Sequence, residues 1–354
     1  MAQQDQVNNL LHSHDVEKVF SMPGTFIQST QQNIPLNKTF NHVPEFVQGD
    51  KSIIPKLVGS LRSVGRVYNP VPKVIQQYTT SVSRCFNLIA CSDGSFWIND
   101  YNVQQVMRVN SSGKVMQVIS NFNIEVEDIS LMSNEELMLC IKKSPVVKVI
   151  AVGSTEIKDS RYNVSPLWAI SVHVTHDNKV MIGVKDTAQA FPASGPRQIK
   201  VMDQSGKQEQ VFEYDNNSQP LFTVPARIDS NKANIVCVLD WISEDADGRI
   251  VVLNKEGILV NVYTGHPKIN SDMPFGPYDI LSSPSDNFLI VEPKTHYLHI
   301  LNSHGNLLTF YNLKQMGIKL PCSISCLGDL FIGSATFIDS EEKAKVYKVD
   351  NFVW

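Results

Sequence analysis

The sequence of 354 residues is poor in charge and has no overall excess of basic residues. Charged residues make up 19% of the chain, and the net charge is −4. Proteins that bind nucleic acids or membranes electrostatically usually carry a clear basic excess, so the composition indicates neither partner. A hydrophobic fraction of 42% predicts a folded globular protein of one large domain or two small ones.

Long hydrophobic runs are also missing. The longest apolar segments, such as residues 146–153, have the length of a β-strand, whereas a membrane-spanning helix needs roughly 20 apolar residues. The opening residues, MAQQDQ, lack the basic and apolar parts of a secretory signal. We therefore expect a cytoplasmic protein with no membrane partner.

Six cysteines are too few for a disulfide framework in a chain of this length. Cys322 and Cys326 have a spacing compatible with half of a zinc site, but no second Cys/His pair follows them. His173 and His176 lie in a strand-like segment without the carboxylate of a zinc-protease motif. We expect neither a metal site nor a cofactor.

Signatures of common enzymes are absent as well. The sequence contains no GxSxG elbow, no GxxxxGK[ST] loop and no strand-linked GxGxxG. The acidic residues 244–248 suggest calcium at first sight, but the remaining positions of an EF-hand are missing. We expect this segment to be a loop that joins strands at residues 235–240 and 249–253.

A repeat is the strongest positive feature of the sequence. Apolar strand-like runs meet glycine-containing turns at intervals of 40 to 53 residues, at Gly113, Gly153, Gly206, Gly257 and Gly305. A period of this length with short β-runs is typical of a repeated β-unit, and Asp, Asn and Gly supply the backbone angles of hairpin turns.

Six such units can be counted, and each contains further short apolar runs upstream of its turn. The first run of each unit lies at residues 85–90, 127–131, 169–173, 226–229, 278–281 and 323–327. Four antiparallel strands in each of six units predict an all-β fold, a six-bladed β-propeller, over residues 71–354. The last unit shows only three strands, so residues 74–79 are expected to supply its outer strand and close the ring.

Residues 1–70 are expected to form a short helical or extended segment that packs partly on the propeller. Helical spacing occurs at residues 8–20, and a second short helix is expected at residues 52–61. The remainder is polar, with too few apolar residues for a core of its own. An alternative is the end of a coiled coil and its linker, and only such a coil would make the chain an oligomer.

Three apolar runs end in an acidic residue, at residues 97–100, 236–240 and 289–292. This pattern resembles NHL-type six-bladed propellers. Residues 8–350 also resemble the propeller end of tripartite-motif-like proteins of bivalve molluscs, including residues 43–46 and 57–61 between coiled coil and propeller. The matching propeller stretches are PKVIQQYT at 72–79, AFPASG at 190–195, SEDADGR at 243–249, VYTGHP at 262–267 and NLKQMGI at 312–318.

The resemblance implies the substrate-recognition end of a tripartite-motif ubiquitin ligase. It departs from that family in one respect, because the RING and B-box zinc modules need closely spaced Cys and His pairs and no CxxC occurs here. We therefore expect a module without enzymatic activity that binds a protein partner through one face of the propeller.

Two alternatives remain open. Some six-bladed propellers are lactonases or esterases with calcium at their centre, and Asp100, Asp240 and Glu292 stand at equivalent strand ends, as such a site requires. The same acids could instead cap loops. Some NHL propellers bind RNA through a basic face, which a net charge of −4 does not favour.

The expected binding residues lie in the loops between second and third strands and between blades, which share one face of a propeller. Aromatic and arginine side chains are the usual anchors of protein interfaces. On this basis the candidate binding residues are Tyr101, Phe191, Arg197, Trp241, Lys294 and His296.

Overall fold

A computed structural model describes residues 43–47, 60–64, 72–337 and 340–350. The chain forms two compact units, Met1–Pro70 and Val71–Trp354. In the described part of the first unit, strands β1 (Val43–Val47) and β2 (Ser60–Val64) form an antiparallel pair. The expected helix at residues 52–61 is wrong at its end, because Ser60 and Leu61 pair with β1. The remainder of that segment and the helix expected at residues 8–20 lie outside the described residues.

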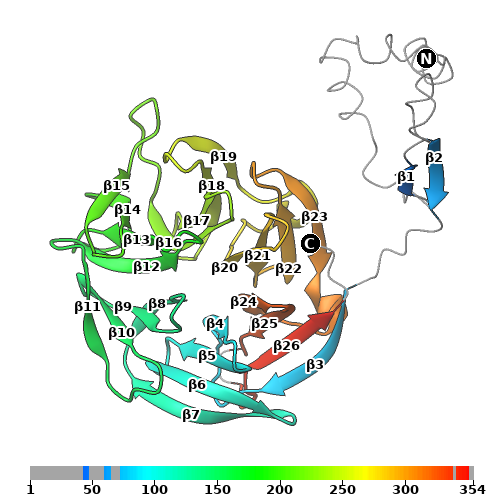
Figure 1. Cartoon of the computed structure of the whole chain (residues 1–354), viewed down its shortest axis with the longest axis horizontal. Helices are drawn as coiled ribbons and strands as arrows, with labels where there is room; N and C mark the ends of the chain where they lie inside the picture. The colour runs from blue at the N-terminus through cyan, green and yellow to red at the C-terminus, as the bar shows by residue number, and fades with distance from the viewer. Residues whose placement is uncertain (1–42, 48–59, 65–71, 338–339, 351–354) are drawn as a thin grey trace, which may run out of the picture. The chain divides into compact units, whose positions relative to one another are not determined.

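The second unit is a six-bladed β-propeller, as predicted, with one four-stranded antiparallel sheet per blade (Figure 1). Blades 1 to 3 are β4 (Asn87–Ala90), β5 (Ser95–Asp100), β6 (Gln105–Ser112) and β7 (Val115–Asn123); β8 (Val126–Leu131), β9 (Leu137–Ile141), β10 (Val146–Ile150) and β11 (Lys158–Asn163); and β12 (Trp168–Val174), β13 (Val180–Lys185), β14 (Arg197–Met202) and β15 (Gln208–Phe212). Blades 4 to 6 are β16 (Val224–Ser230), β17 (Val236–Trp241), β18 (Gly248–Leu253) and β19 (Leu259–Tyr263); β20 (Asp279–Ser282), β21 (Phe288–Glu292), β22 (Tyr297–Leu301) and β23 (Leu307–Asn312); and β24 (Pro321–Leu327), β25 (Asp329–Ser334), β26 (Lys345–Asp350) and β3 (Lys73–Thr79).

The ring closes through the predicted N-terminal strand. Strand β3 pairs antiparallel with β26 and becomes the outer strand of blade 6. A single parallel bridge between Thr79 and Val115 then joins this strand to blade 1. Backbone hydrogen bonds from the two ends of the propeller therefore complete its last blade without a covalent link.

The hydrophobic core is divided among the six blade interfaces. Each of the six clusters of buried apolar side chains draws its members from two neighbouring blades. Between blades 1 and 2, for example, Trp97 and Phe122 share a cluster with Leu137. Burying one large apolar side chain contributes about 1.5–3 kcal/mol, so adhesion between blades holds the fold together.

The burial pattern along each blade explains why the repeat could be recognised in the sequence. The second strands, such as β17 and β21, are buried on both faces and appear as continuous apolar runs. The outer strands are largely exposed, and β7 has Val115, Val118 and Ile119 at the surface. The only helical segments in the described ranges are α4 (Pro267–Asn270) and η2 (Leu313–Met316). In that part of the chain, no helix has the length and apolar character needed to cross a bilayer.

Candidate functional site

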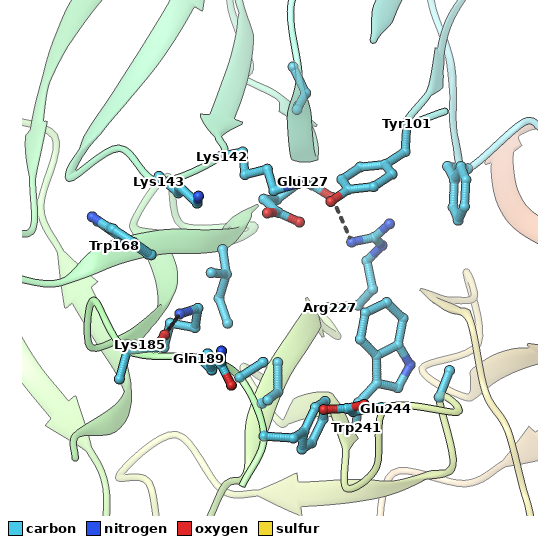
Figure 2. Close-up of a pocket in the computed structure, with 18 of the residues that line it drawn as sticks. Tyr101, Glu127, Lys142, Lys143, Trp168, Lys185, Gln189, Arg227, Trp241 and Glu244 are labelled. Carbon is cyan, nitrogen blue, oxygen red and sulfur yellow. Dashed lines mark hydrogen bonds between the residues drawn. The ribbon is translucent and has the colours of Figure 1, made fainter. Parts of the chain in front are cut away.

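A hollow of about 780 Å³ opens at the centre of the propeller, and we call it the central pocket (Figure 2). Its walls are formed by the first residues of the innermost strands and by the loops between second and third strands. They come from blades 1 to 5. These are the loops expected to carry a binding face. The volume lies within the range of about 300–1,000 Å³ that is usual for small-molecule sites.

Aromatic side chains form much of the pocket wall. Trp241, at the end of β17, donates its indole N–H to the carbonyl of Pro277 at 3.1 Å, and its ring lies 5.9 Å from that of Tyr278. Tyr278, directly before the first strand of blade 5, in turn stacks on Phe86, directly before the first strand of blade 1, with centroids 6.3 Å apart. The six aromatic lining residues are Phe86, Tyr101, Trp168, Phe191, Trp241 and Tyr278.

Three lysines form a basic rim. Lys142 pairs with Glu125, which raises the pKa of Lys142, and its ammonium lies 4.9 Å from the ring centroid of Tyr101. Lys185 in β13 lies directly opposite Trp168 in β12, and its ammonium group lies 4.7 Å from the centroid of the Trp168 ring. Burial lowers the pKa of Lys185.

Lys143 is the exposed member of the rim. Within the described ranges, no carboxylate lies within ion-pair distance of its ammonium group. A bound anion could therefore pair with Lys143 without displacing a partner of the protein itself.

Arg227 forms the floor of the pocket and is only 7% exposed. It lies in β16 of blade 4 and reaches blade 2, where Nη1 donates to the carbonyl of Glu127 at 3.0 Å (Figure 2). The same nitrogen lies 3.5 Å from Asp128 Oδ1, and Nε lies 3.8 Å from Asp279 Oδ1. The guanidinium group thus stands between two buried carboxylates from different blades.

Arg227 belongs to a repeated position that we call the axial ring. At this position each innermost strand contributes one polar side chain, and every one of them contacts the next blade around the ring. The members are Asn87, Asp128, Ser171, Arg227, Asp279 and Ser323. A β-bulge directly precedes the ring residue in blades 2, 3, 4 and 6, and bulges re-aim side chains in this way.

One hydrogen bond of the axial ring joins two side chains, and the other four join a side chain to the backbone of the next blade. Asn87 Nδ2 donates to Asp128 Oδ1 at 2.8 Å, Val172 N to Asp128 Oδ2 at 3.0 Å, Ser171 Oγ to Pro225 O at 2.7 Å, Ile324 N to Asp279 Oδ2 at 2.9 Å, and Ser323 Oγ to Cys85 O at 2.6 Å. The two serines require glycine opposite them, because a Cβ on Gly183 would lie 2.1 Å from Ser171 Oγ.

Burial makes the acidic members of the ring hard to ionise. It raises the pKa of Asp279 to about 7, although the guanidinium of Arg227 and the amides of Ile324 and Ile280 act in the opposite direction. The pKa of Asp128 is raised for the same reason and is likewise opposed by Arg227. A carboxyl group that titrates near neutral pH therefore lies beneath the pocket.

The three acids at the strand ends cap loops, which was the second of the two interpretations of this pattern; we call them the loop-cap acids. Asp100 Oδ2 accepts from the backbone of Ser83 and Arg84 at 3.1 Å. Asp240 Oδ1 accepts from the backbone of Thr223 and Val224 at 2.7 Å, and its Oδ2 accepts from Arg249 Nε at 2.9 Å.

Glu292 follows the same rule, since its Oε1 accepts from Gly276 N at 3.0 Å. Burial acts to raise its pKa, but hydrogen bonds from His299, Thr295 and Gly276 outweigh this effect and hold the pKa below its usual range. Each acid bonds within its own blade or to the loop that enters it. In the described part of the chain, no three acidic, His or Cys side chains are grouped as a metal site.

The three acids that were expected to converge on a central calcium instead accept hydrogen bonds from donors of the protein itself. The two acids of the axial ring already share an internal cation, Arg227. The acidic segment 244–248 is the predicted loop between β17 and β18, and its Asp247 pairs with Lys294.

The sequence-predicted binding residues fall into two groups. Tyr101, Phe191 and Trp241 are half-buried and line the central pocket. The other three, Arg197, Lys294 and His296, do not line it. Whether any of the six binds a partner stays a prediction.

The three residues outside the pocket have structural partners. Arg197 is buried, and its Nη1 lies 2.6 Å from Asp186 Oδ1 while Nη2 donates to Gln189 O at 3.3 Å. It therefore holds the loop that carries Phe191. Lys294 pairs with Asp247, and His296 Nδ1 accepts from Leu320 N at 3.0 Å.

Sequence reasoning missed Arg227, Trp168 and the three rim lysines. Arg227 lies within a segment that was used only as an apolar strand, residues 226–229, where a charged residue was itself a signal. Trp168 and Lys185 sit at strand ends that lack the acidic repeat. These residues line the central pocket because blades 2 and 3 lie side by side around it. The local sequence pattern of a single blade does not show this arrangement.

The remaining sequence candidates for metal binding are structural. Cys322 is buried and Cys326 half-buried, and both are free thiols. His173 Nε2 lies 2.8 Å from Ser230 Oγ, and burial lowers its pKa.

No protein-family model matches the chain, and no curated protein matches its sequence. Among solved structures, it is similar to streptogramin B lyase, with a TM-score of 0.52 and 11% identity over 78% of this chain and 96% of that one. A second similar structure is regucalcin, a calcium-binding protein from Agrobacterium tumefaciens, with a TM-score of 0.54 and 10% identity over 79% and 94% of the two chains. A third is a luciferin-regenerating enzyme, with a TM-score of 0.55 and 12% identity over 79% and 95%.

These similarities show the β-propeller fold. At identities of 10–12% they do not distinguish an NHL or tripartite-motif propeller from other kinds, since one fold hosts many unrelated functions.

Proposed function

We propose that this chain is a recognition module that binds an anionic, aromatic-bearing ligand in the central pocket. One observation carries the proposal: six aromatic side chains and a rim of three lysines surround a single ligand-sized hollow, in a chain whose net charge is −4. Aromatic rings offer large, rigid apolar contact surfaces, and ammonium groups attract carboxylates and phosphates.

Such a ligand has two sources. One is an acidic segment of a protein partner, which agrees with the sequence resemblance to the substrate-recognition end of cytoplasmic tripartite-motif proteins. The other is a free organic acid, which agrees with the concave shape of the site. Both present the same chemistry to the pocket, so the experiment must separate them.

Isothermal titration of the full chain with two probes makes this test. The probes are biphenyl-4-carboxylate and the capped peptide Asp-Glu-Trp-Asp-Glu. Lys143→Glu should weaken binding of the better probe about tenfold, because it replaces an unpaired attractive charge with a repulsive one, which amounts to about 1.4 kcal/mol. Lys207→Glu, an exposed change on the β14–β15 turn, is the matched control and should change Kd less than about twofold.

Tighter binding of the peptide identifies a protein segment as the source, and tighter binding of the acid identifies a small molecule. The proposal is wrong if neither probe binds, or if both lysine variants change Kd equally. Binding of a ten-nucleotide oligouridine with a steep loss of affinity in salt, and of neither probe, would replace the proposal with RNA recognition.

A hydrolase is the second candidate, and one observation favours it beyond the enzymatic structural neighbours. Glu127 is a half-buried carboxylate in the pocket wall, and burial raises its pKa, against the effects of Lys142 and Arg227. Carboxyl groups perturbed in this way inside clefts are candidate general bases.

Turnover of 4-nitrophenyl acetate and of a simple lactone decides this candidate. A hydrolase predicts turnover that Glu127→Gln abolishes and that calcium does not increase, since the donor set does not fit that ion. Turnover no faster than that of albumin at equal concentration removes the hydrolase and leaves the binding module.

A further inference from the structure

Two nearly inaccessible side chains at the pocket floor each have a polar atom without a hydrogen-bond partner. Asn99 is 1% exposed and Arg227 is 7% exposed, and both line the pocket. Asn99 Oδ1 and Arg227 Nε have no partner among the described residues. A buried polar group without a partner is costly, and beside a cavity such an atom can be satisfied by a ligand or an ordered water.

The orientation of the Asn99 amide follows from its other contact. Asn99 Nδ2 donates to the carbonyl of Val126 at 3.1 Å, and a carbonyl can only accept. The amide oxygen must therefore be the atom that remains unpaired, and it is an acceptor. Its strand neighbour Asn87 is fixed in the same way, because its Nδ2 donates to Asp128, which also leaves an unpaired Oδ1.

The two side chains with unpaired atoms are held by neighbouring residues of the backbone. Asn99 bonds to the carbonyl of Val126, and Arg227 bonds to the carbonyl of the next residue, Glu127. Both side chains are therefore anchored at the start of β8. A ligand group at the pocket floor would need to reach the unpaired acceptor and the unpaired donor together.

The charge balance of the floor disfavours an anion at this point. Arg227 already stands between Asp128 and Asp279, at 3.5 and 3.8 Å. A ligand carboxylate would face these two acids and also the acceptor oxygen of Asn99. Attraction for an anion is instead available at the rim, where Lys143 has no acidic partner.

We propose that the ligand enters with a neutral hydroxyl or carboxamide group first, which donates to Asn99 Oδ1 and accepts from Arg227, while its anionic end stays at the lysine rim. This inference rests on the proposed function and adds the orientation of the ligand. The ligand has a neutral group at the pocket floor that both donates and accepts a hydrogen bond, an aromatic middle part, and an acidic group at the lysine rim. A tyrosine, asparagine or glutamine side chain beside acidic residues would satisfy it in a protein, and a hydroxyaryl acid would satisfy it among small molecules.

Three matched acids test the inference on the wild-type chain by titration calorimetry. Compared with biphenyl-4-carboxylate, 4′-hydroxybiphenyl-4-carboxylate should bind about tenfold more tightly, as expected for one buried hydrogen-bonded group. The 4′-methoxy compound accepts but cannot donate, so it should bind no more tightly than the parent acid.

Asn99→Leu then locates the effect. This variant should reduce the preference for the hydroxyl compound over biphenyl-4-carboxylate to less than about twofold, whereas Asn217→Leu on the exposed β15–β16 loop should preserve the preference. If Asn99→Leu does not fold, the three wild-type affinities still decide the question.

The outcomes separate the two proposals. Equal affinities for the three acids, with sensitivity to Lys143→Glu, overturn the inference and leave the proposed function standing, because the floor is then filled by water. A preference for the hydroxyl compound that survives Asn99→Leu also overturns the inference. Failure of all three acids and of the acidic peptide to bind overturns the proposed function, and the inference with it.

Discussion

The loop-cap acids and the axial ring are two repeated sets of buried polar groups, and they bond in different directions. Asp100, Asp240 and Glu292 are fully buried and bond to the loop that enters their own blade. The members of the axial ring hydrogen-bond to the next blade, except Arg227, whose hydrogen bond crosses to blade 2. Both sets satisfy backbone amides or carbonyls, so burial alone does not distinguish their roles.

The difference lies in what each set leaves unsatisfied. Every oxygen of Asp240 has a protein donor, whereas the region around the axial ring leaves Asn87 Oδ1 and Arg227 Nε without hydrogen-bond partners. A complete set of bonds indicates a structural role, and an incomplete set beside a cavity indicates a ligand. Four substitutions can break or sharpen this distinction.

Asp240→Ala should have the largest effect on stability. It leaves two backbone amides and the Arg249 guanidinium without their acceptor, and breaking a buried ion pair from one side costs about 3–5 kcal/mol. Urea unfolding measures the loss, with Asp245→Ala in the exposed loop as control. A loss below 1 kcal/mol would show that the loop-cap acids do not stabilise the blades.

Arg227→Met should cost about 3 kcal/mol at pH 8, because it leaves the ionised carboxylate of Asp279, and the carboxyl group of Asp128, without their shared cation. At pH 5 the loss should be clearly smaller, since the raised pKa of Asp279, about 7, keeps that carboxyl neutral. Urea unfolding at both pH values compares the variants. An equal loss at pH 5 and pH 8 would contradict this description of the floor.

Asp279→Asn measures how the titration of the Asp279 carboxyl group, in the axial ring, affects stability. A carboxyl group whose pKa is raised by folding, here from 3.8 to about 7, stabilises the native state below its unfolded pKa and loses this contribution as pH rises through its folded pKa. The wild type should therefore lose roughly 2 kcal/mol relative to the variant between pH 5 and pH 7. Parallel stability curves would mean that Asp279 is ionised throughout this range.

The six-bladed architecture could be predicted from the sequence because each blade repeats the same pattern of apolar runs and turn residues. Six blades are predicted by the continuous apolar second strands, such as residues 236–240, and by turn residues such as Asn231. Closure of the propeller is predicted by the last unit, which shows only three strands of its own. The repeat also indicated the loops that line the central pocket, and three of the six candidate residues, Tyr101, Phe191 and Trp241, lie there.

The site itself could not be predicted from the repeat, because it depends on what differs between blades. Arg227 reaches across the ring to blade 2, a contact between residues 100 positions apart in sequence. Arg197 has the residue type of an interface anchor, yet its partner Asp186 draws it inward. Residue type suggests chemistry, but only the closed ring shows which charged groups are already paired.

Ser171→Ala has the smallest expected effect and separates closure of the ring from ligand binding. Ser171 makes the same kind of contact to the next blade as its charged counterparts, but only one neutral hydrogen bond to Pro225 O is lost, which costs about 1 kcal/mol. The loss should be independent of pH between 5 and 8 and should be matched by Ser323→Ala in blade 6. If these values are found, neutral residues suffice to join blades, and closure does not explain the charged members Asp128, Arg227 and Asp279. Their position beneath the central pocket then indicates that these charged residues serve ligand binding. A loss of stability in Ser171→Ala as large and as pH-dependent as that in Arg227→Met would instead indicate that they stabilise the fold.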